Sequence, residues 1–379
     1  MGIIRTMESL KAEMEEIKTM ITQTIQRKPG EDLVASQAIE SREKVVCVTS
    51  GVSYLGLSVA GELLLRGYHV RLGVENEEHV EKLGEMEAFA SVRHRVQVVM
   101  AKVMEVESLC EAFNGCHGVF HTSAFDAGGI SGYTKHLAEL EAKAGENVIE
   151  ACSRTSSVRK CVFTSSLLAC IWRPTVSSFS PAIDESCWSQ ESFCREKKEM
   201  KYSRLNCIGI SLVQGDVQFA IRLKRRCPSA LWLALGKTIA EKSAWMKARE
   251  MNVNLVTICP ALITGPGFYD RNSTASIAYL KGAHEMFASG LLATVNVAKV
   301  AKAHVAAYEE MSRGAAGRYI CFDKVIRATE DAVELQQQMK IAGRMIQFTQ
   351  DALPLYDLRN TKLRKLMSVY RQCTHTTYL

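Results

Sequence analysis

A short turn near residue 50 is the first place where residue types and spacing suggest chemistry. A β-branched apolar run, Val45 to Thr49, leads into the turn, and an amphipathic helix from Leu55 to Leu65 follows it. The amino end of such a helix presents backbone N–H groups and a positive dipole end, which can bind a pyrophosphate. We therefore expect a dinucleotide here, contacted by Thr49, Gly51, Ser53, Tyr54, Leu55 and Gly56.

The turn departs from an ideal glycine pattern. That pattern has glycine at positions 50, 53 and 56, and only Gly56 stands in register. We expect Gly51 to supply the tight turn one residue late, and Ser53 is small enough for phosphates to approach. The segment thus predicts an intact strand–turn–helix unit with a weakened phosphate site.

The end of the second expected strand bears on the choice of cofactor. Glu75 lies 19 residues after Gly56, near the position of the acid that contacts adenosine ribose hydroxyls. A carboxylate there repels a 2′-phosphate, so the sequence predicts an NAD(P) site that favours NAD over NADP. The alternative is an exposed loop glutamate. Arg71 is nearby, and strand alternation predicts that it points elsewhere.

Strands and helices alternate along the chain from residue 44. We expect strands at Val45–Thr49, His69–Val74, Arg95–Met100, Gly118–His121, Lys160–Thr164 and Asn254–Cys259, with helices between them around Val80–Phe89 and Leu137–Cys152. Repeated units of this length indicate a parallel sheet covered on both faces. The predicted fold class is α/β: a Rossmann-type doubly wound parallel sheet with a smaller C-terminal substrate lobe.

Three regions follow from this organisation. Residues 1–41 form an N-terminal helical extension and linker, residues 42–265 the NAD(P)-binding domain, and residues 266–379 the substrate lobe and C-terminal helices. An apolar stripe in the extension has helical spacing that would suit a dimer or a helix docked on the main domain: Ile3, Met7, Leu10, Met14, Ile17 and Ile21. Met1 to Thr6 also fits the loose N-myristoylation pattern.

Composition narrows the function classes. The 379 residues are 47% hydrophobic and 23% charged, as in ordinary globular proteins, and no apolar run approaches the roughly 20 residues of a membrane span. Thirteen cysteines without a CxxC pair suggest reduced thiols in the cytoplasm and no metal site. Residues 200–229 carry six basic and one acidic side chain, which leaves +1 of the +6 net charge elsewhere. This distribution does not favour nucleic-acid binding.

The chain from Lys44 to about Asp323 resembles the plant cinnamoyl-CoA reductase and dihydroflavonol reductase group of extended short-chain dehydrogenases. Six segments carry the resemblance in the family's order: Gly118–Thr122, Val162–Ser166, Asp184–Ser189, Gly236–Trp245, Pro260–Pro266 and Gly317–Cys321. The resemblance implies an NAD(P)-dependent oxidoreductase of phenylpropanoid-type carbonyl or acyl-CoA substrates.

The resemblance also implies roles for individual residues. Ser166 would be the catalytic serine that hydrogen-bonds the substrate carbonyl, and Lys237 would hold the nicotinamide ribose. Thr122, Ser123 and Pro260 would contact the cofactor. Family members that use NADP typically have an arginine in place of Glu75, and the family's adenine-contacting Asp-Leu is replaced here by Lys102-Val103.

One residue of the family's catalytic set is missing. The family places a tyrosine four positions before its lysine, where the phenol exchanges a proton with the substrate oxygen, and here Leu233 occupies that position. Leucine cannot transfer a proton, so the resemblance implies reduced or lost activity. The alternative is a non-catalytic Rossmann-fold protein that binds a nucleotide or a partner.

Residues 200–229 form an atypical insert just before Leu233. The insert is basic, lacks a clean periodicity and has no counterpart in the family, so it is either translated intron or a genuine insertion. A mature transcript that encodes it in abundance would contradict the first interpretation. Tyr202 within it is a further candidate for the missing phenol, although nothing in the sequence positions it.

The C-terminal part offers fewer signals. The family builds its substrate lobe around residues 273–290, and a helix from Val297 to Met311 follows. His304 lies on that helix, far from the other candidate residues, so we interpret it as structural. Leu363, Leu366 and Tyr370 have helical spacing and predict a docked terminal helix.

Overall fold

Seven parallel strands form the central sheet, in the order β10-β7-β5-β4-β1-β2-β3. β1 pairs in parallel with β2 on one side and with β4 on the other, and the strand order reverses between β1 and β4, so the switch point lies there. The bounds are β1 (Val45–Thr49), β2 (His69–Val74), β3 (Val96–Met100), β4 (Gly118–His121), β5 (Lys160–Thr164), β7 (Leu255–Pro260) and β10 (Gly317–Cys321). The six predicted strands are confirmed to within one residue, and β10 is an additional strand.

The computed structural model describes residues 44–76, 94–122, 133–174, 181–195, 229–268, 279–280, 282–338 and 355–375. Four predictions fall outside these residues. They are the N-terminal apolar stripe with its possible dimer, the helix around Val80–Phe89, the cofactor contact of Ser123, and the insert from residue 200 as far as residue 228.

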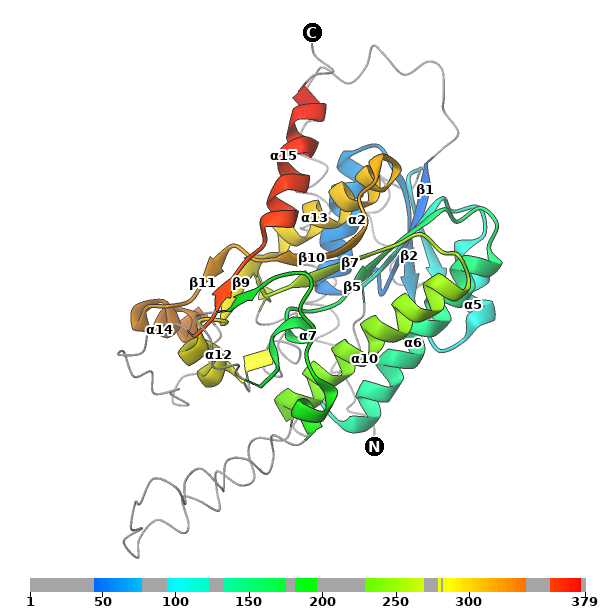
Figure 1. Cartoon of the computed structure of the whole chain (residues 1–379). Helices are drawn as coiled ribbons and strands as arrows, with labels where there is room; N and C mark the ends of the chain where they lie inside the picture. Colours follow the sequence, from blue (N-terminus) through cyan, green and yellow to red (C-terminus); the bar gives the residue numbers. More distant parts are fainter. Residues whose placement is uncertain are drawn as a thin grey trace, which may run out of the picture.

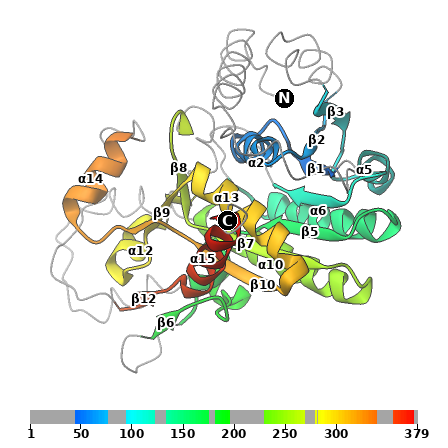
Figure 2. The ribbon, with the colours of Figure 1, turned by 90° about the horizontal axis from the view of Figure 1, so that it is seen from above.

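Helices cover both faces of the sheet (Figures 1 and 2). On one face α13 (Val297–Glu310) packs against α2 (Tyr54–Leu65) and α15 (Thr361–His375); on the other, α6 (Lys135–Arg154) packs against α5 (Val106–Phe113) and α10 (Ser229–Glu250). The two sides of β1 enter different cores, Val46 and Val48 on the α2 side and Cys47 on the α6 side. The predicted doubly wound parallel sheet is therefore confirmed.

Short elements gather at one end of the sheet (Figure 2). A three-stranded sheet has the order β11-β9-β8, and β12 pairs with β6. Their bounds, with those of the neighbouring helices, are α7 (Leu168–Ile171), β6 (Ala182–Ile183), β8 (Leu262–Thr264), α12 (Ala283–Ser289), β9 (Ala293–Asn296), β11 (Lys324–Val325), α14 (Thr329–Gln338) and β12 (Asp357–Leu358). η3 (Met311–Arg313) lies at the opposite end of the sheet, where Lys160 at the start of β5 donates to Ser312 Oγ. The predicted division of the chain at residue 265 stays a prediction. β10 and α13 follow residue 265 in sequence and pack with the main sheet.

The C-terminal helix α15 docks on the main body, as predicted. Leu363 and Tyr370 are buried on its inward side, and Leu366 packs against the same core. The Arg66 guanidinium, from the residue after α2, lies 4.5 Å from the centre of the Tyr370 ring. The end of the chain is thereby held against the α2 and α13 layer.

Candidate cofactor cleft and active site

The turn between β1 and α2 has its left-handed residue at Ser50, with φ of 48°. Gly51, which we expected to supply the tight turn, is not the left-handed residue. It lets the turn approach β2: its N–H donates to Gly73 O at 2.8 Å, and an added Cβ would lie 2.8 Å from Leu72 Cα. A serine in the left-handed region costs roughly 1–2 kcal/mol, which the surrounding packing must offset.

Ser53 caps α2 and alters the phosphate site. Its side chain accepts a hydrogen bond from Gly56 N at 3.0 Å, so that N–H is occupied inside the protein. A Cβ on Gly56 would lie 2.3 Å from Ser50 O, which explains the glycine. The cramped turn and the helix amino end together fit a pyrophosphate, with one donor fewer than an uncapped helix would offer.

Tyr54 and Leu55 lie in the wall of the cleft. Both side chains are buried, so only their backbone atoms could contact a bound dinucleotide. The Tyr54 hydroxyl donates to Pro266 O at 3.1 Å and joins α2 to the segment after β8. Gly265 makes room for this contact, because a Cβ there would lie 2.8 Å from the Tyr54 hydroxyl oxygen.

The carboxyl ends of β1 and β4 meet at the switch point. Thr49 Oγ1 lies 2.9 Å from His121 Nδ1, and Thr122 Oγ1 donates to Thr49 O at 2.5 Å. Burial lowers the pKa of His121 to about 3, and the positive charge of Lys237 adds to the effect. The His121 ring is therefore neutral at pH 7.

Ser166 follows β5 and lies beside α10. Its hydroxyl accepts a hydrogen bond from Leu168 N at 3.2 Å and is almost fully buried. α10, which carries Lys237, packs against α7, the helix that begins two residues after Ser166. The two residues that the resemblance assigns to catalysis thus come from neighbouring elements.

Lys237 has a buried partner that the sequence analysis missed. Its Nζ lies 2.6 Å from Glu141 Oε1, and the Tyr133 hydroxyl donates to Glu141 Oε2. Glu141 follows Ala138 by three residues and precedes Val148 by seven, on the inward face of α6. A carboxylate on the apolar side of a predicted helix was the signal that could have identified it.

Leu233 packs where the family has its tyrosine. The leucine is 7% exposed and belongs to the main hydrophobic core. It lies one helical turn before Lys237 on α10, so the side chains project from the same face. The position is filled by an apolar group that can bind no proton.

Glu75 is exposed at the end of β2, next to the cleft. Surrounding protein atoms partly desolvate its carboxyl and raise the pKa, and a hydrogen bond with the backbone of Val103 opposes the shift. Arg71 points away, as predicted, because its guanidinium donates to Ala112 O at 3.0 Å and Asn114 O at 2.5 Å. Pro260 is the last residue of β7, buried, and its carbonyl accepts from Leu167 N at 2.8 Å.

A buried ion pair anchors α10 to the sheet. Arg318 Nε lies 2.7 Å from Glu241 Oε1 and its Nη2 lies 2.9 Å from Oε2. Ser165 and Thr257 also donate to this carboxylate, at 2.6 and 2.7 Å. Because Ser165 precedes Ser166 and Glu241 lies one turn after Lys237, the pair fixes the helix relative to the end of β5.

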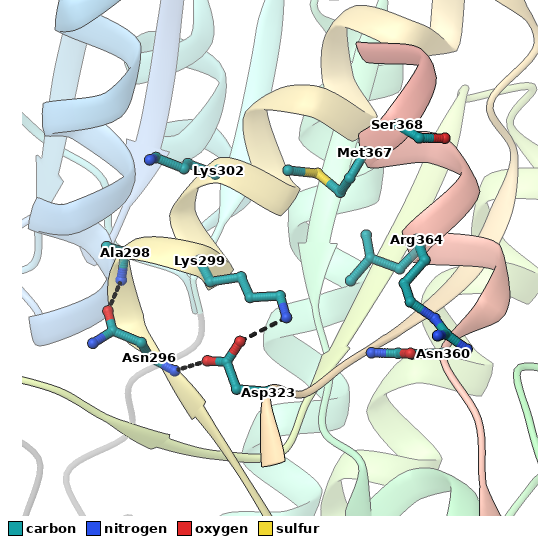
Figure 3. A pocket seen from close by; sticks show the side chains of 10 residues that line it. Asn296, Ala298, Lys299, Lys302, Asp323, Asn360, Arg364, Met367 and Ser368 are labelled. Carbon is teal, nitrogen blue, oxygen red and sulfur yellow. Dashed lines mark hydrogen bonds and ion pairs between the residues drawn. The ribbon is translucent and has the colours of Figure 1, made fainter. Parts of the chain in front are cut away.

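A cavity of about 640 Å³ lies away from this cleft, between α13 and α15 (Figure 3). Lys299, Lys302 and Arg364 line it, and Asp323 neutralises Lys299 at 2.6 Å. None of the predicted cofactor or catalytic residues contributes to its wall. The predicted chemistry therefore belongs to the strand ends and not to this cavity.

His304 is fully buried between Thr164 Oγ1 at 2.7 Å and Val300 O at 2.8 Å, as expected of a structural histidine. Cys187 and Cys194, which are close in sequence, are not joined by a disulfide. No described helix is long and apolar enough to cross a bilayer. Within the described ranges, no group of three or more His, Cys, Asp or Glu side chains could hold a metal ion.

Known proteins of similar sequence are reductases. A family model for NAD(P)H-binding matches residues 53–202. Cinnamoyl-CoA reductase 1 of Petunia hybrida is 30% identical over 345 residues, which cover 88% of this chain and 91% of the relative. Tetraketide alpha-pyrone reductase 1 of Arabidopsis thaliana is 30% identical over 291 residues, 75% of this chain and 78% of the relative.

Solved structures share the fold at lower identity. Vestitone reductase from alfalfa has a TM-score of 0.55 at 20% identity, covering 85% of this chain and 91% of that chain. Yeast methylglyoxal/isovaleraldehyde reductase, complexed with NADPH, has a TM-score of 0.59 at 16% identity, covering 86% of this chain and 93% of that chain. The fold, the family model and the long alignments agree that this chain belongs to the cinnamoyl-CoA reductase and dihydroflavonol reductase group of extended short-chain, NAD(P)-binding reductases.

Proposed function

We propose that the protein is an NAD(P)H-dependent reductase of phenylpropanoid-type aldehydes, ketones or acyl-CoA thioesters, and that it works slowly because Leu233 replaces the family's phenol. The observation that carries this proposal is the place of Lys237. Lys237 lies on α10, which packs against α7, the helix that begins two residues after Ser166 at the carboxyl end of β5. Open α/β sheets bind dinucleotides beyond the carboxyl ends of their strands. The names of the relatives, which include cinnamoyl-CoA reductases, support the substrate class.

Each side of the cleft would have a separate task. The backbone of the β1–α2 turn would hold the pyrophosphate, and Lys237 the nicotinamide ribose. A bound reduced nicotinamide would supply the hydride. Ser166 accepts its hydrogen bond from Leu168 N, so its own hydrogen can point at a substrate oxygen and orient the carbonyl.

The missing phenol limits the rate. General acid–base assistance contributes roughly 10²–10⁴-fold, so a site without it retains only orientation and proximity. A water molecule held by Ser166 and Lys237 would then protonate the reduced substrate. Such an enzyme binds its cofactor normally and turns over slowly.

The cofactor preference follows from charge at the end of β2. Glu75 would accept hydrogen bonds from ribose hydroxyls and repel a 2′-phosphate. Arg71 is engaged at the end of α5 and would not offset that repulsion. We therefore propose NAD as the preferred cofactor.

Titration of the purified full chain with NADH and NADPH tests this function. We expect both to bind with NADH the tighter, and Glu75→Arg to reverse the order. Binding of neither cofactor would reject the reductase.

The alternative is a non-catalytic protein that binds a nucleotide or a partner, and the buried Leu233 is the observation in its favour. A chain that binds cofactor but reduces no cinnamoyl-type substrate after Leu233→Tyr would support that alternative.

A further inference from the structure

The surroundings of Lys237 contain a carboxylate and a phenol to which neither the family resemblance nor the proposed function gives a role. Lys237 on α10 lies 2.6 Å from Glu141 on α6, and Tyr133, two residues before α6, donates to the other oxygen of Glu141. The three side chains form one continuous hydrogen-bonded chain. Its exposed end is Lys237, whose side chain is 16% exposed, against 4% for Glu141.

Burial makes the three groups interdependent. A carboxylate as buried as Glu141 needs both charge compensation and hydrogen bonds, and removing one partner of a buried ion pair is strongly destabilising. Lys237 supplies the charge and Tyr133 the hydrogen bond. Burial, together with the Glu141 carboxylate, raises the pKa of Tyr133, so the phenol keeps its proton and donates.

Gly236 brings the Tyr133 phenol onto α10. A Cβ at Gly236 would lie 2.7 Å from the Tyr133 hydroxyl oxygen and 2.9 Å from Ala138 Cα. Leu233 lies three residues before Gly236, on the same face of the helix. The phenol of Tyr133 therefore packs against the face of α10 that carries Leu233 and Gly236.

We propose that Glu141, oriented by Tyr133, positions the Lys237 ammonium in the cleft. The two residues do so in a site where Leu233 stands in the place of the family's tyrosine. The carboxylate of Glu141 engages the Lys237 ammonium from the α6 side. Glu141 and Tyr133 are positioning residues, because Lys237 is the group that would contact the cofactor. This inference rests on the proposed function, which assigns the nicotinamide ribose to Lys237.

The first measurement needs no activity. Trace acetylation of lysines, followed by mass spectrometry, reports how accessible each amine is. We expect Glu141→Gln to increase the labelling of Lys237 several-fold, and Tyr133→Phe to increase it less, because Phe keeps the ring packing and loses only one hydrogen bond. Lys324, which lies in an exposed ion pair with Asp331 away from this site, is the internal reference.

The second measurement separates positioning from simple stability. Glu141→Gln should lower kcat on the order of 10²-fold, the cost of misplacing a group in a reacting site, with little change in the substrate KM. Glu141→Asp, which keeps the charge, should recover part of the loss. Glu191→Gln is the matched control: it breaks an ion pair of 2.9 Å with Lys242 that is exposed, and should change neither labelling of Lys237 nor kcat.

The outcomes distinguish the two proposals. If the wild-type chain binds neither NADH nor NADPH, the proposed function fails. If it binds and reduces, and Glu141→Gln has wild-type kcat and cofactor affinity, then only the positioning role fails, whatever the labelling shows. Should Glu141→Gln fail to fold, Tyr133→Phe carries the same test, and unchanged labelling, kcat and cofactor affinity in that variant would overturn the inference.

Discussion

Leu233 is a single residue on which the rate of the proposed reaction depends. It is buried on α10, one turn before Lys237, and adjoins the face against which Tyr133 packs. The proposed site also contains Ser166 after β5, Lys237 on α10 and the close turn between β1 and α2. Leu233 is therefore the position at which a single substitution tests the proposed function.

Leu233→Tyr is expected to raise kcat for cinnamoyl-type substrates. The gain should lie roughly between 10²- and 10⁴-fold, since the phenol restores general acid assistance. Leu233→Phe is the control, because it adds the ring without the hydroxyl and should leave kcat at the wild-type level. Stopped-flow or steady-state NADH oxidation measures both, with and without residues 200–229. Equal rates for the two variants would show that the phenol was not what limited activity.

His304 predicts how stability depends on pH. Val300 O can only accept, so Nδ1 carries the proton and Nε2 accepts from Thr164. Burial lowers the pKa of His304 from 6.5 to about 4, and the bond to Val300 opposes the shift. Between these values the unfolded chain binds a proton that the folded chain does not, so the stabilisation is complete above pH 6.5 and is lost as the pH falls toward about 4.

His304→Gln isolates this contribution. From pH 7 to pH 4 the free energy of unfolding should fall by on the order of 3 kcal/mol more in the wild type than in the variant. Urea unfolding followed by tryptophan fluorescence at each pH gives the comparison. Parallel pH curves for the two chains would contradict the assignment of a neutral buried ring.

At the scale of helices and strands, the buried ion pair between Glu241 and Arg318 fixes the position of α10 relative to the sheet. The carboxylate is fully buried and accepts hydrogen bonds from Ser165, Thr257, Cys259 and two nitrogens of Arg318. The guanidinium also stacks on Trp188, at 3.6 Å from the ring centre. Arg318 belongs to β10 at the sheet edge, so the pair joins the catalytic helix to a strand late in the sequence. Loss of either partner leaves a buried group uncompensated.

Arg318→Met should destabilise the protein by about 3–5 kcal/mol, because Glu241 would be left buried and charged. Thermal unfolding followed by circular dichroism measures the loss. Lys324→Met is the control, since it breaks an ion pair with Asp331 in which the lysine is half exposed, and such pairs contribute roughly 0–1 kcal/mol. The double variant Glu241→Met with Arg318→Met should lose less than the single one; equal losses would mean that packing, not charge, explains the effect.

The sequence predicted elements better than it predicted contacts. Alternation of β-branched runs and amphipathic helices located six strands, because burial on both faces imposes a local signal on each strand. The sequence did not predict β10, because Gly317–Cys321 begins with a glycine and a charged residue. The left-handed conformation of Ser50 was not predicted, since a serine adopts it only when the surrounding packing compensates. Glu141 and Tyr133 were missed because their relation to Lys237 exists only once α6 packs on α10.

The described body of the molecule is self-contained. The seven strands of the main sheet lie between residues 45 and 321, both faces of that sheet are covered, and α15 returns to close the α13 side. β1 is paired on both edges, with β2 and with β4, so the first strand of the sheet lies in its interior.

Removal of residues 1–41 should change the free energy of unfolding by less than about 1 kcal/mol. In a chain this long, such a change leaves the melting temperature within about 2 °C of that of the full chain. NADH affinity should be unchanged, because the cofactor cleft is built from β1 onward. Sedimentation of both chains at several concentrations also tests the apolar stripe: a helix-mediated dimer predicts that the full chain dimerises and the truncated chain does not. A drop in Tm of more than about 5 °C would mean instead that the extension packs on the body and buries apolar surface there, because a loss of that size corresponds to more than 1 kcal/mol.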